Sequence, residues 1–202
     1  MKVFIDIGAH IGETLQEVRK PEYGFDKIYA FEPVIGNCGF IIDNFHDSRI
    51  CILPYGLLNK TAELKVYNPG SDGATIFKNK KGVVENKLET VCQFIKASLW
   101  FKEDVNADDE NIVKINAEGS EVAIINDLLS NDEYDKIDKI FIDFDVRKIP
   151  EMKHLEKKTI KKLEKLGYTN FVTQNDIKRR GKHPVDVAGN RIKDWLGDAK
   201  DS

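Results

Sequence analysis

The first residues whose types and spacing could do chemistry lie close to the N-terminus. One acidic residue and two glycines form the pattern D-x-G-x-x-x-G in the segment Asp6-Ile7-Gly8-Ala9-His10-Ile11-Gly12. Glycines let the backbone turn sharply and approach a ligand closely. The spacing differs from the G-x-G-x-x-G loop that offers backbone amides to a pyrophosphate. It therefore favours an adenosyl cofactor with a methionine tail, S-adenosylmethionine, over a dinucleotide.

A carboxylate follows at a second place where it could contact such a cofactor. Glu32 comes 20 residues after Gly12, in the segment Tyr29-Ala30-Phe31-Glu32-Pro33. An acid at this place in a nucleotide-binding βαβ unit accepts hydrogen bonds from ribose hydroxyls. Taken alone, the glycine segment is a plain tight turn as readily as a binding loop, and Glu32 is an exposed surface residue. Because the two stand in register, we predict a cofactor site.

A third polar cluster lies in the middle of the chain, in the segment Lys114-Ile115-Asn116-Ala117-Glu118-Gly119-Ser120-Glu121. It follows an apolar strand and precedes a helix, which is where a doubly wound sheet presents its reacting groups. The alternative is a simple helix start, in which Glu118 and Glu121 favour the positive end of the helix dipole.

Alternating strands and helices are expected to position these segments. Apolar runs predict strands over residues 2–7, 27–31, 49–57, 62–67, 112–115, 137–144, 168–173 and 184–188. Helical spacing predicts helices over residues 13–20, 88–97, 120–129 and 151–166, and another in the stretch that holds Phe40, Ile41 and Phe45. This alternation predicts a mostly parallel sheet with helices on both faces and ligands beyond the carboxyl ends of its strands. No repeat or linker divides the chain, so we expect a single domain over residues 1–202.

The composition narrows the class of protein and of partner. With 202 residues, 41% hydrophobic and 32% charged, the chain suits one soluble domain. Its 31 basic and 34 acidic residues are spread evenly and leave a net charge of -3, so no basic face indicates nucleic acid. No apolar run approaches the roughly 18 residues of a membrane span, and the N-terminus runs into a strand instead of a signal peptide. We expect a small-molecule or glycan partner.

The cysteines indicate a compartment. Cys38, Cys51 and Cys92 are odd in number, lack CxxC spacing and lie in apolar stretches, which favours reduced buried thiols over disulfides or a zinc site. We therefore expect a cytoplasmic protein. No metal-ligand spacing is visible in the sequence.

Three motifs together resemble the FkbM family of S-adenosylmethionine-dependent methyltransferases. They are Asp6-x-Gly8-Ala9-x-Ile11-Gly12, Phe31-Glu32-Pro33-x-x-x-Asn37 and Lys114-Ile115-x-x-Glu118-Gly119-x-Glu121, in the family's order and spacing. The segment Lys87-Leu88-Glu89-Thr90-Val91 is similar to a degenerate helix start of that family. The resemblance implies a Rossmann-like class I methyltransferase fold, in which a seven-stranded, mostly parallel sheet with an antiparallel last strand carries helices on both faces. It also implies methyl transfer to a hydroxyl oxygen, usually of a sugar or a polyketide.

The resemblance also implies roles for single residues. Asp6, Gly8 and Gly12 would line the methionine end of the cofactor, and Glu32 would take the ribose. The remaining predicted cofactor contacts are Ala9, His10, Pro33, Asn37 and Asn116. The loop over residues 71–75 is expected to close over the site, which makes Asp72 and Thr75 candidate acceptor contacts.

Two departures from the family pattern affect the chemistry. His10 stands where Asn is usual, and Asn116 stands where Asp is usual. An amide cannot act as a general base, so the residue that deprotonates the acceptor hydroxyl is sought elsewhere. Asp143 and then Asp145 are the first candidates, because strand alternation places both on one face, and Glu118 is a third. Asn116 would orient the acceptor, and ordinary solvation at a strand end is the alternative for both aspartates.

Two further functions are compatible with the same fold. A nicotinamide-dependent oxidoreductase would use Glu32 but would need the three-glycine loop that is missing here. A catalytically inactive Rossmann-like module that binds a glycan or a protein is favoured by Asn116. Because relatives usually carry an extra segment before the first motif, we expect either a minimal enzyme or an excised domain of a larger glycan-modifying protein.

Overall fold

Six parallel strands form the central sheet, in the order β3-β2-β1-β7-β8-β9. The computed structural model describes residues 1–83, 88–180 and 188–197. The strands are β1 (Lys2–Ile7), β2 (Lys27–Phe31), β3 (Ile50–Leu53), β7 (Glu110–Ile115), β8 (Lys139–Ile142) and β9 (Phe171–Thr173). Every residue of β1 after Lys2 is buried, which fits a strand covered on both faces.

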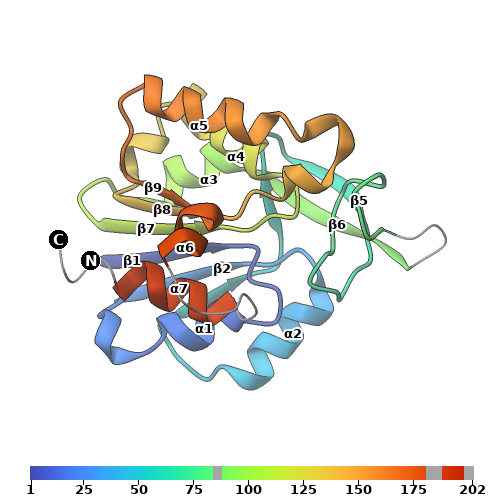
Figure 1. Cartoon of the computed structure of the whole chain (residues 1–202). Coiled ribbons are helices and arrows are strands. Elements are labelled where there is room, and N and C mark those ends of the chain that lie inside the picture. Colours follow the sequence, from blue (N-terminus) through green and yellow to red (C-terminus); the bar gives the residue numbers. More distant parts are fainter. Residues whose placement is uncertain (84–87, 181–187, 198–202) are drawn as a thin grey trace.

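Helices cover both faces of this sheet (Figure 1). One face carries α1 (Glu13–Val18), α2 (Ile35–Asn44), α6 (Gln174–Arg180) and α7 (Ala188–Gly197), and the other carries α3 (Ala97–Asp104), α4 (Glu121–Ser130) and α5 (Leu155–Lys165). Short 3₁₀ turns are η1 (Pro21–Tyr23), η2 (Tyr134–Lys136), η3 (Asp145–Lys148) and η4 (Pro150–Met152). Each face has its own core, with Leu15 and Trp195 in one and Trp100 and Ile124 in the other. The architecture is therefore doubly wound α/β.

A second, three-stranded sheet is inserted between β3 and α3. It consists of β4 (Gly56–Leu58), β6 (Glu89–Lys96) and β5 (Ala62–Tyr67), with β4 parallel and β5 antiparallel to the middle strand β6. Figure 1 shows β5 and β6 beyond the end of the central sheet that lies away from the N-terminus. Leu58, Val66 and Phe94 of this sheet pack with Val34 at the start of α2, so the second sheet stands beside the carboxyl ends of the central strands.

The structure corrects the expected elements in two places before α3. The helix expected over 88–97 is wrong, because β6 occupies most of that range: Cys92 and Phe94 are buried, whereas Val91 and Gln93 are exposed, which is the period of a strand. The family-like segment that ends at Val91 therefore does not start a helix. The strand expected over 49–57 is divided into β3 and β4, with Pro54 between them, which has no amide to continue a ladder.

The predicted seven-stranded sheet with an antiparallel last strand also differs from the structure. In the described ranges the central sheet has six strands, and all of its pairings are parallel. The seventh strand, expected over 184–188, lies outside the described residues except for Ala188, which begins α7. Helices on both faces and the βαβ alternation are confirmed.

The structure also describes the three cysteines and the length of the helices. Cys38 and Cys92 are buried free thiols, and Cys51 is half-buried. Within the ranges that the structure describes, every helix is too short or too polar to cross a membrane.

Candidate cofactor and acceptor site

The central sheet changes its direction of winding between β1 and β7. The chain runs from β1 to β2 and β3 on one side, and from β7 to β8 and β9 on the other. Such a switch point opens a crevice outside the carboxyl ends of the strands, where doubly wound proteins bind ligands. A cavity of about 680 Å³, including the part open to solvent, lies there. Turns after β1, β2 and β7, the second sheet and residues 71–76 form its walls.

The turn after β1 is shaped by Gly8. Its φ is 89°, and its amide and that of Ala9 both donate to the Phe31 carbonyl, over 3.1 and 2.9 Å. A Cβ atom at Gly8 would lie 2.0 Å from the Asn116 carbonyl oxygen, so no other residue fits without moving β7's turn. Gly12, with φ 93°, makes room for the Phe45 ring and does not line the cavity.

Asp6 lies behind this turn, in a buried ion pair. Its Oδ1 accepts a hydrogen bond from Lys114 Nζ at 2.8 Å, and the same ammonium donates to the Gly8 carbonyl at 2.7 Å. Burial raises the pKa of the Asp6 carboxyl, and the Lys114 charge opposes that effect. Asp6 does not line the cavity, so it supports the Gly8 turn from behind, and its Oδ2 has no hydrogen-bond partner among the described residues.

Glu32 places its carboxylate in the cavity wall directly after β2. The carboxylate is held by the His10 amide at 2.9 Å, the Val34 amide at 2.9 Å and the Asn37 side chain at 3.2 Å. Only 5% of the residue is exposed. Burial raises the pKa of this carboxyl, and the three hydrogen bonds lower it again. The side chain is thus fixed in one orientation before any ligand arrives.

His10 connects the glycine turn to the first helix. Its φ of 52° is unusual for a residue with a side chain, and its Nδ1 lies 2.8 Å from Oε1 of Glu13. The hydrogen bond to Glu13 raises the pKa of the His10 imidazole, and the charges of Glu13 and Glu32 add to this. Its Nε2 is buried without a hydrogen bond of normal geometry in the described part of the chain. His10 therefore lines the cavity with an imidazole that Glu13 orients and that Gly70 also contacts.

The turn after β7 forms the opposite polar wall. Asn116 donates its amide to the Ile7 carbonyl at 2.9 Å, and both Asn116 and Glu118 are among the residues that line the cavity. Glu118 has φ 51° and forms an ion pair with Lys80. Thr75 donates its hydroxyl to the Glu118 carbonyl at 2.7 Å, which joins the loop over the cavity to this turn.

Asp143 and Asp145 lie behind that wall. Asp143 accepts from Arg147, while Asp145 lies 2.6 Å from Lys148 Nζ and 3.3 Å from Lys80 Nζ. Neither aspartate lines the cavity. Their expected common strand face is wrong, because β8 ends at Ile142 and Asp145 already begins η3.

An apolar wall from the second sheet completes the cavity. Leu57, Val66 and Phe94 come from its three strands, and Ile76 adds to them from the loop. A Cβ atom at Gly56 would lie 2.5 Å from the Phe94 ring, so this glycine lets β4 approach β6 closely. Sequence reasoning misses Phe94 because its segment is expected to be a helix. It misses Leu57 and Val66, which lie in expected strands, because they reach the cavity only through pairing with β6.

The cavity brings together most of the predicted site residues. Those that line it are Gly8, His10, Glu32, Pro33, Asn37, Asp72, Thr75, Asn116 and Glu118. Those that do not are Asp6, Ala9, Gly12, Asp143 and Asp145. Sequence reasoning also missed Lys80, which lies outside the motifs, and the pairing of Lys114 with Asp6, which stand in two different motifs. Among the described residues, no group of three or more His, Cys, Asp or Glu side chains is arranged to hold a metal ion.

Comparison with known proteins does not show the family of this chain. No family model matches the sequence, and no curated protein matches it. One solved structure that resembles the chain is methyltransferase FkbM from Methylobacillus flagellatus KT, with a TM-score of 0.41 and 17% identity. The match covers 64% of this chain and 29% of that chain, so this protein spans less than a third of its neighbour. The function is therefore inferred from the site.

Proposed function

We propose that this protein is an S-adenosylmethionine-dependent methyltransferase. The observation that carries the proposal is the position of the Glu32 carboxylate. Backbone amides hold it in the cavity wall at the end of β2, beside a turn in which position 8 has room only for glycine. An acid at this position of a doubly wound sheet accepts hydrogen bonds from the ribose hydroxyls of an adenosyl group. Oε1 already accepts two hydrogen bonds and Oε2 one, so Oε2 retains a free lone pair for a hydroxyl.

The hydrogen bonds of the glycine turn argue against a dinucleotide. A pyrophosphate is normally held by free backbone amides at the start of the first helix. Here the amides of Gly8 and Ala9 donate to Phe31, the amide of His10 donates to Glu32, and the amide of Gly12 donates to Ala9. These four amides are therefore not available to phosphate oxygens.

The charges around the cavity favour a cationic cofactor. Glu32, Asp72 and Glu118 line it, whereas the lining residues include neither lysine nor arginine in the described part of the chain. Opposite charges attract more strongly in a partly buried site than in water. S-adenosylmethionine carries a positive sulfonium, which supplies an already activated methyl group when the cofactor is bound. The His10 imidazole, which also lines the cavity, offers a further polar contact to such a ligand.

For the acceptor, we propose a hydroxyl group of a sugar or another small glycan. The polar wall with Asn116 and Glu118 faces an apolar wall with Leu57 and Phe94, which together suit a ring that has a polar edge and an apolar face. This charge pattern does not favour nucleic acid, because phosphates would meet carboxylates.

The same geometry favours Glu118 over Asp143 as the base. Glu118 lines the cavity, whereas Asp143 is directed to Arg147 behind the wall. In the proposed reaction, Asn116 orients the acceptor hydroxyl, whose oxygen forms the new bond to the methyl carbon while its proton passes to Glu118. Bound S-adenosylmethionine would supply the methyl group, with the electron pair of its broken C–S bond left on sulfur. Holding the oxygen in line with that bond supplies most of the rate.

Calorimetry with S-adenosylmethionine and its demethylated product tests the cofactor. Glu32→Ala should weaken both at least tenfold, because one hydrogen bond to a buried charge contributes about 1.5 to 3 kcal/mol. Glu164→Ala, on the exposed side of α5, is the matched control and should bind like the wild type. NAD binding at similar strength would overturn the methyltransferase proposal.

A screen of sugars and glycans with mass detection tests the reaction itself. Methylation of a sugar hydroxyl is the expected result. Cofactor binding without methylation of any acceptor would instead support an inactive binding module, the alternative that Asn116 suggests.

A further inference from the structure

A buried lysine behind the cavity, Lys80, connects the loop over the cavity to its polar wall. Only 3% of the residue is exposed. Its ammonium forms an ion pair with Glu118 and lies 3.3 Å from Oδ2 of Asp145. Burial of an ammonium group is costly unless the charge is paired. The arrangement therefore suggests a role beyond packing.

The segment that carries Lys80 is firmly docked. The Lys81 amide donates to the carbonyl of Lys148, the last residue of η3, at 2.8 Å. The Phe77 ring packs so closely on Gly119 that a Cβ atom there would lie 2.9 Å from it. Thr75 is bonded to Glu118, as described above. Lys80 thus reaches Glu118 from a loop that is held on both sides.

The two carboxylates beside Lys80 differ in how many other cations they contact. Asp145 also faces Lys148, at 2.6 Å, and Arg147, at 3.3 Å. In the described part of the chain, Glu118 has no ion pair other than that with Lys80. Asp145 therefore keeps two cations without Lys80, whereas Glu118 keeps none.

We propose that Lys80 is a positioning residue that fixes the Glu118 carboxylate at the cavity wall and keeps it in its charged form. The proposal deepens the proposed function, because a charged carboxylate is the form that accepts a proton from an acceptor hydroxyl. Burial lowers the pKa of the Lys80 ammonium, and Asp145 and Glu121 raise it again, while Lys148 lowers it further. The net effect is a lowered pKa of Lys80, which its ion pairs with Glu118 and Asp145 oppose.

The first test needs no substrate. The Glu118 carboxyl is titrated by carbon NMR in wild type, in Lys80→Met and in Lys78→Met, an exposed lysine of the same loop. Removal of a close opposite charge typically raises a carboxyl pKa by about 1 to 3 units. We expect that rise in Lys80→Met and none in Lys78→Met. An unchanged Glu118 titration in Lys80→Met would overturn the proposal, whether or not the protein methylates anything.

The second test separates positioning from a merely structural role. In Lys80→Met the acid limb of the kcat profile should move to higher pH, while calorimetric affinity for S-adenosylmethionine stays within about twofold. A rate that falls equally at every pH would contradict the proposal. If Lys80→Met does not fold, the Lys80 ammonium is titrated in Glu118→Gln instead. Its pKa should fall there, and an unchanged value would count against the pair.

Discussion

The residues proposed to do chemistry lie on strained turns. His10 and Glu118 both have φ near 50°, a region that side chains rarely adopt, and both line the cavity. Such strain persists only where the surrounding structure enforces it, and it concentrates at functional sites. At His10 the amide is held by Glu32, and at Glu118 the carbonyl is held by Thr75. Both strained positions thus belong to polar residues that line one cavity.

Replacement of Gly8 should weaken S-adenosylmethionine binding and stability by more than the strain of a positive φ alone would cause. Gly8 and Gly167 have nearly equal φ values, 89° and 87°, but a Cβ atom meets the Asn116 carbonyl at Gly8 and nothing within 4 Å at Gly167. Gly167→Ala should cost about 1 to 2 kcal/mol of stability through its left-handed backbone alone. Gly8→Ala should cost more and should weaken S-adenosylmethionine binding at least tenfold. Urea denaturation and calorimetry on both variants measure these effects. Equal losses of stability and affinity in the two variants would show that the contact with the Asn116 carbonyl does not matter.

The identity of the base gives a kinetic prediction. Loss of a positioned general base usually lowers the rate by about 10²- to 10⁴-fold. Glu118→Gln should therefore lower the single-turnover rate at saturating cofactor at least a hundredfold. Asp143→Asn, which keeps the cavity lining intact, should lower it severalfold at most. If Asp143→Asn has the larger effect, the base expected from the sequence is correct, and if both effects are small, His10 is the next residue to test.

At the scale of elements, the start of α4 holds the polar wall in place. Glu121 accepts the Gly119 amide at 2.8 Å and the Ala117 amide at 3.2 Å, so its carboxylate closes the turn that carries Glu118. The sequence indicated a helix start here, with Glu121 in the first turn. It did not indicate full burial, which arises because α5 and η3 pack over the turn and cannot be read from local spacing.

This burial predicts a pH dependence of stability. Burial, with Asp145 and Asp143 nearby, raises the pKa of Glu121 from 4.5 to about 7. Between these values the folded protein binds the extra proton, so this group stabilises the fold below about pH 4.5, and that stability is lost as the pH rises through 7. Glu121→Gln lacks this titration. Its free energy of unfolding relative to wild type should rise by about 2 to 3 kcal/mol between pH 5 and pH 8.

Urea denaturation at several pH values measures this difference. Glu164→Gln, exposed on α5, controls for the loss of a negative charge from the surface. A difference between Glu121→Gln and wild type that stays constant across this pH range would show that Glu121 is not the titrating group.

On the scale of the whole molecule, the cavity lies between two sheets. Strand alternation and the motifs were sufficient to predict the doubly wound sheet and the residues at the ends of β1, β2 and β7. The facing wall could not be predicted, because Leu57, Val66 and Phe94 are far apart in the sequence and meet only when β4 and β5 pair with β6. Non-local pairing of this kind leaves no short motif.

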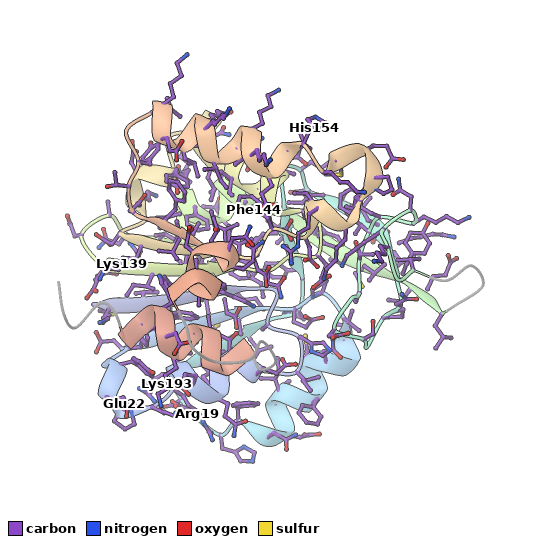
Figure 2. The ribbon with its side chains drawn as sticks, in the orientation of Figure 1. Arg19, Glu22, Lys139, Phe144, His154 and Lys193 are labelled. Atoms are coloured by element: carbon purple, nitrogen blue, oxygen red, sulfur yellow. The ribbon has the colours of Figure 1, made fainter. Side chains whose placement is uncertain are left out.

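A second cavity serves as an internal control for locating the bound ligand by hydrogen exchange. It lies at the opposite end of the central sheet and is lined by Glu22, Lys139 and Trp195, among others. Figure 2 labels Glu22 and Lys139. A ligand at the switch point should slow amide hydrogen exchange in both sheets at once, over residues 7–10, 31–37, 56–58, 71–76 and 116–120. Exchange around Trp195 should not change.

Ligand binding at the switch point should also raise the melting temperature, Tm, of the protein. At a free concentration of about 100 times Kd, a ligand stabilises the fold by about 2.7 kcal/mol, which corresponds to a rise in Tm of roughly 5 to 10 °C for a chain of this size. The demethylated product of S-adenosylmethionine should produce this rise in wild type, because it joins groups from both sheets, and much less of it in Glu32→Ala. Protection confined to the cavity of Trp195, or an equal rise in Tm with Glu32→Ala, would place the ligand away from the switch point and contradict the assignment.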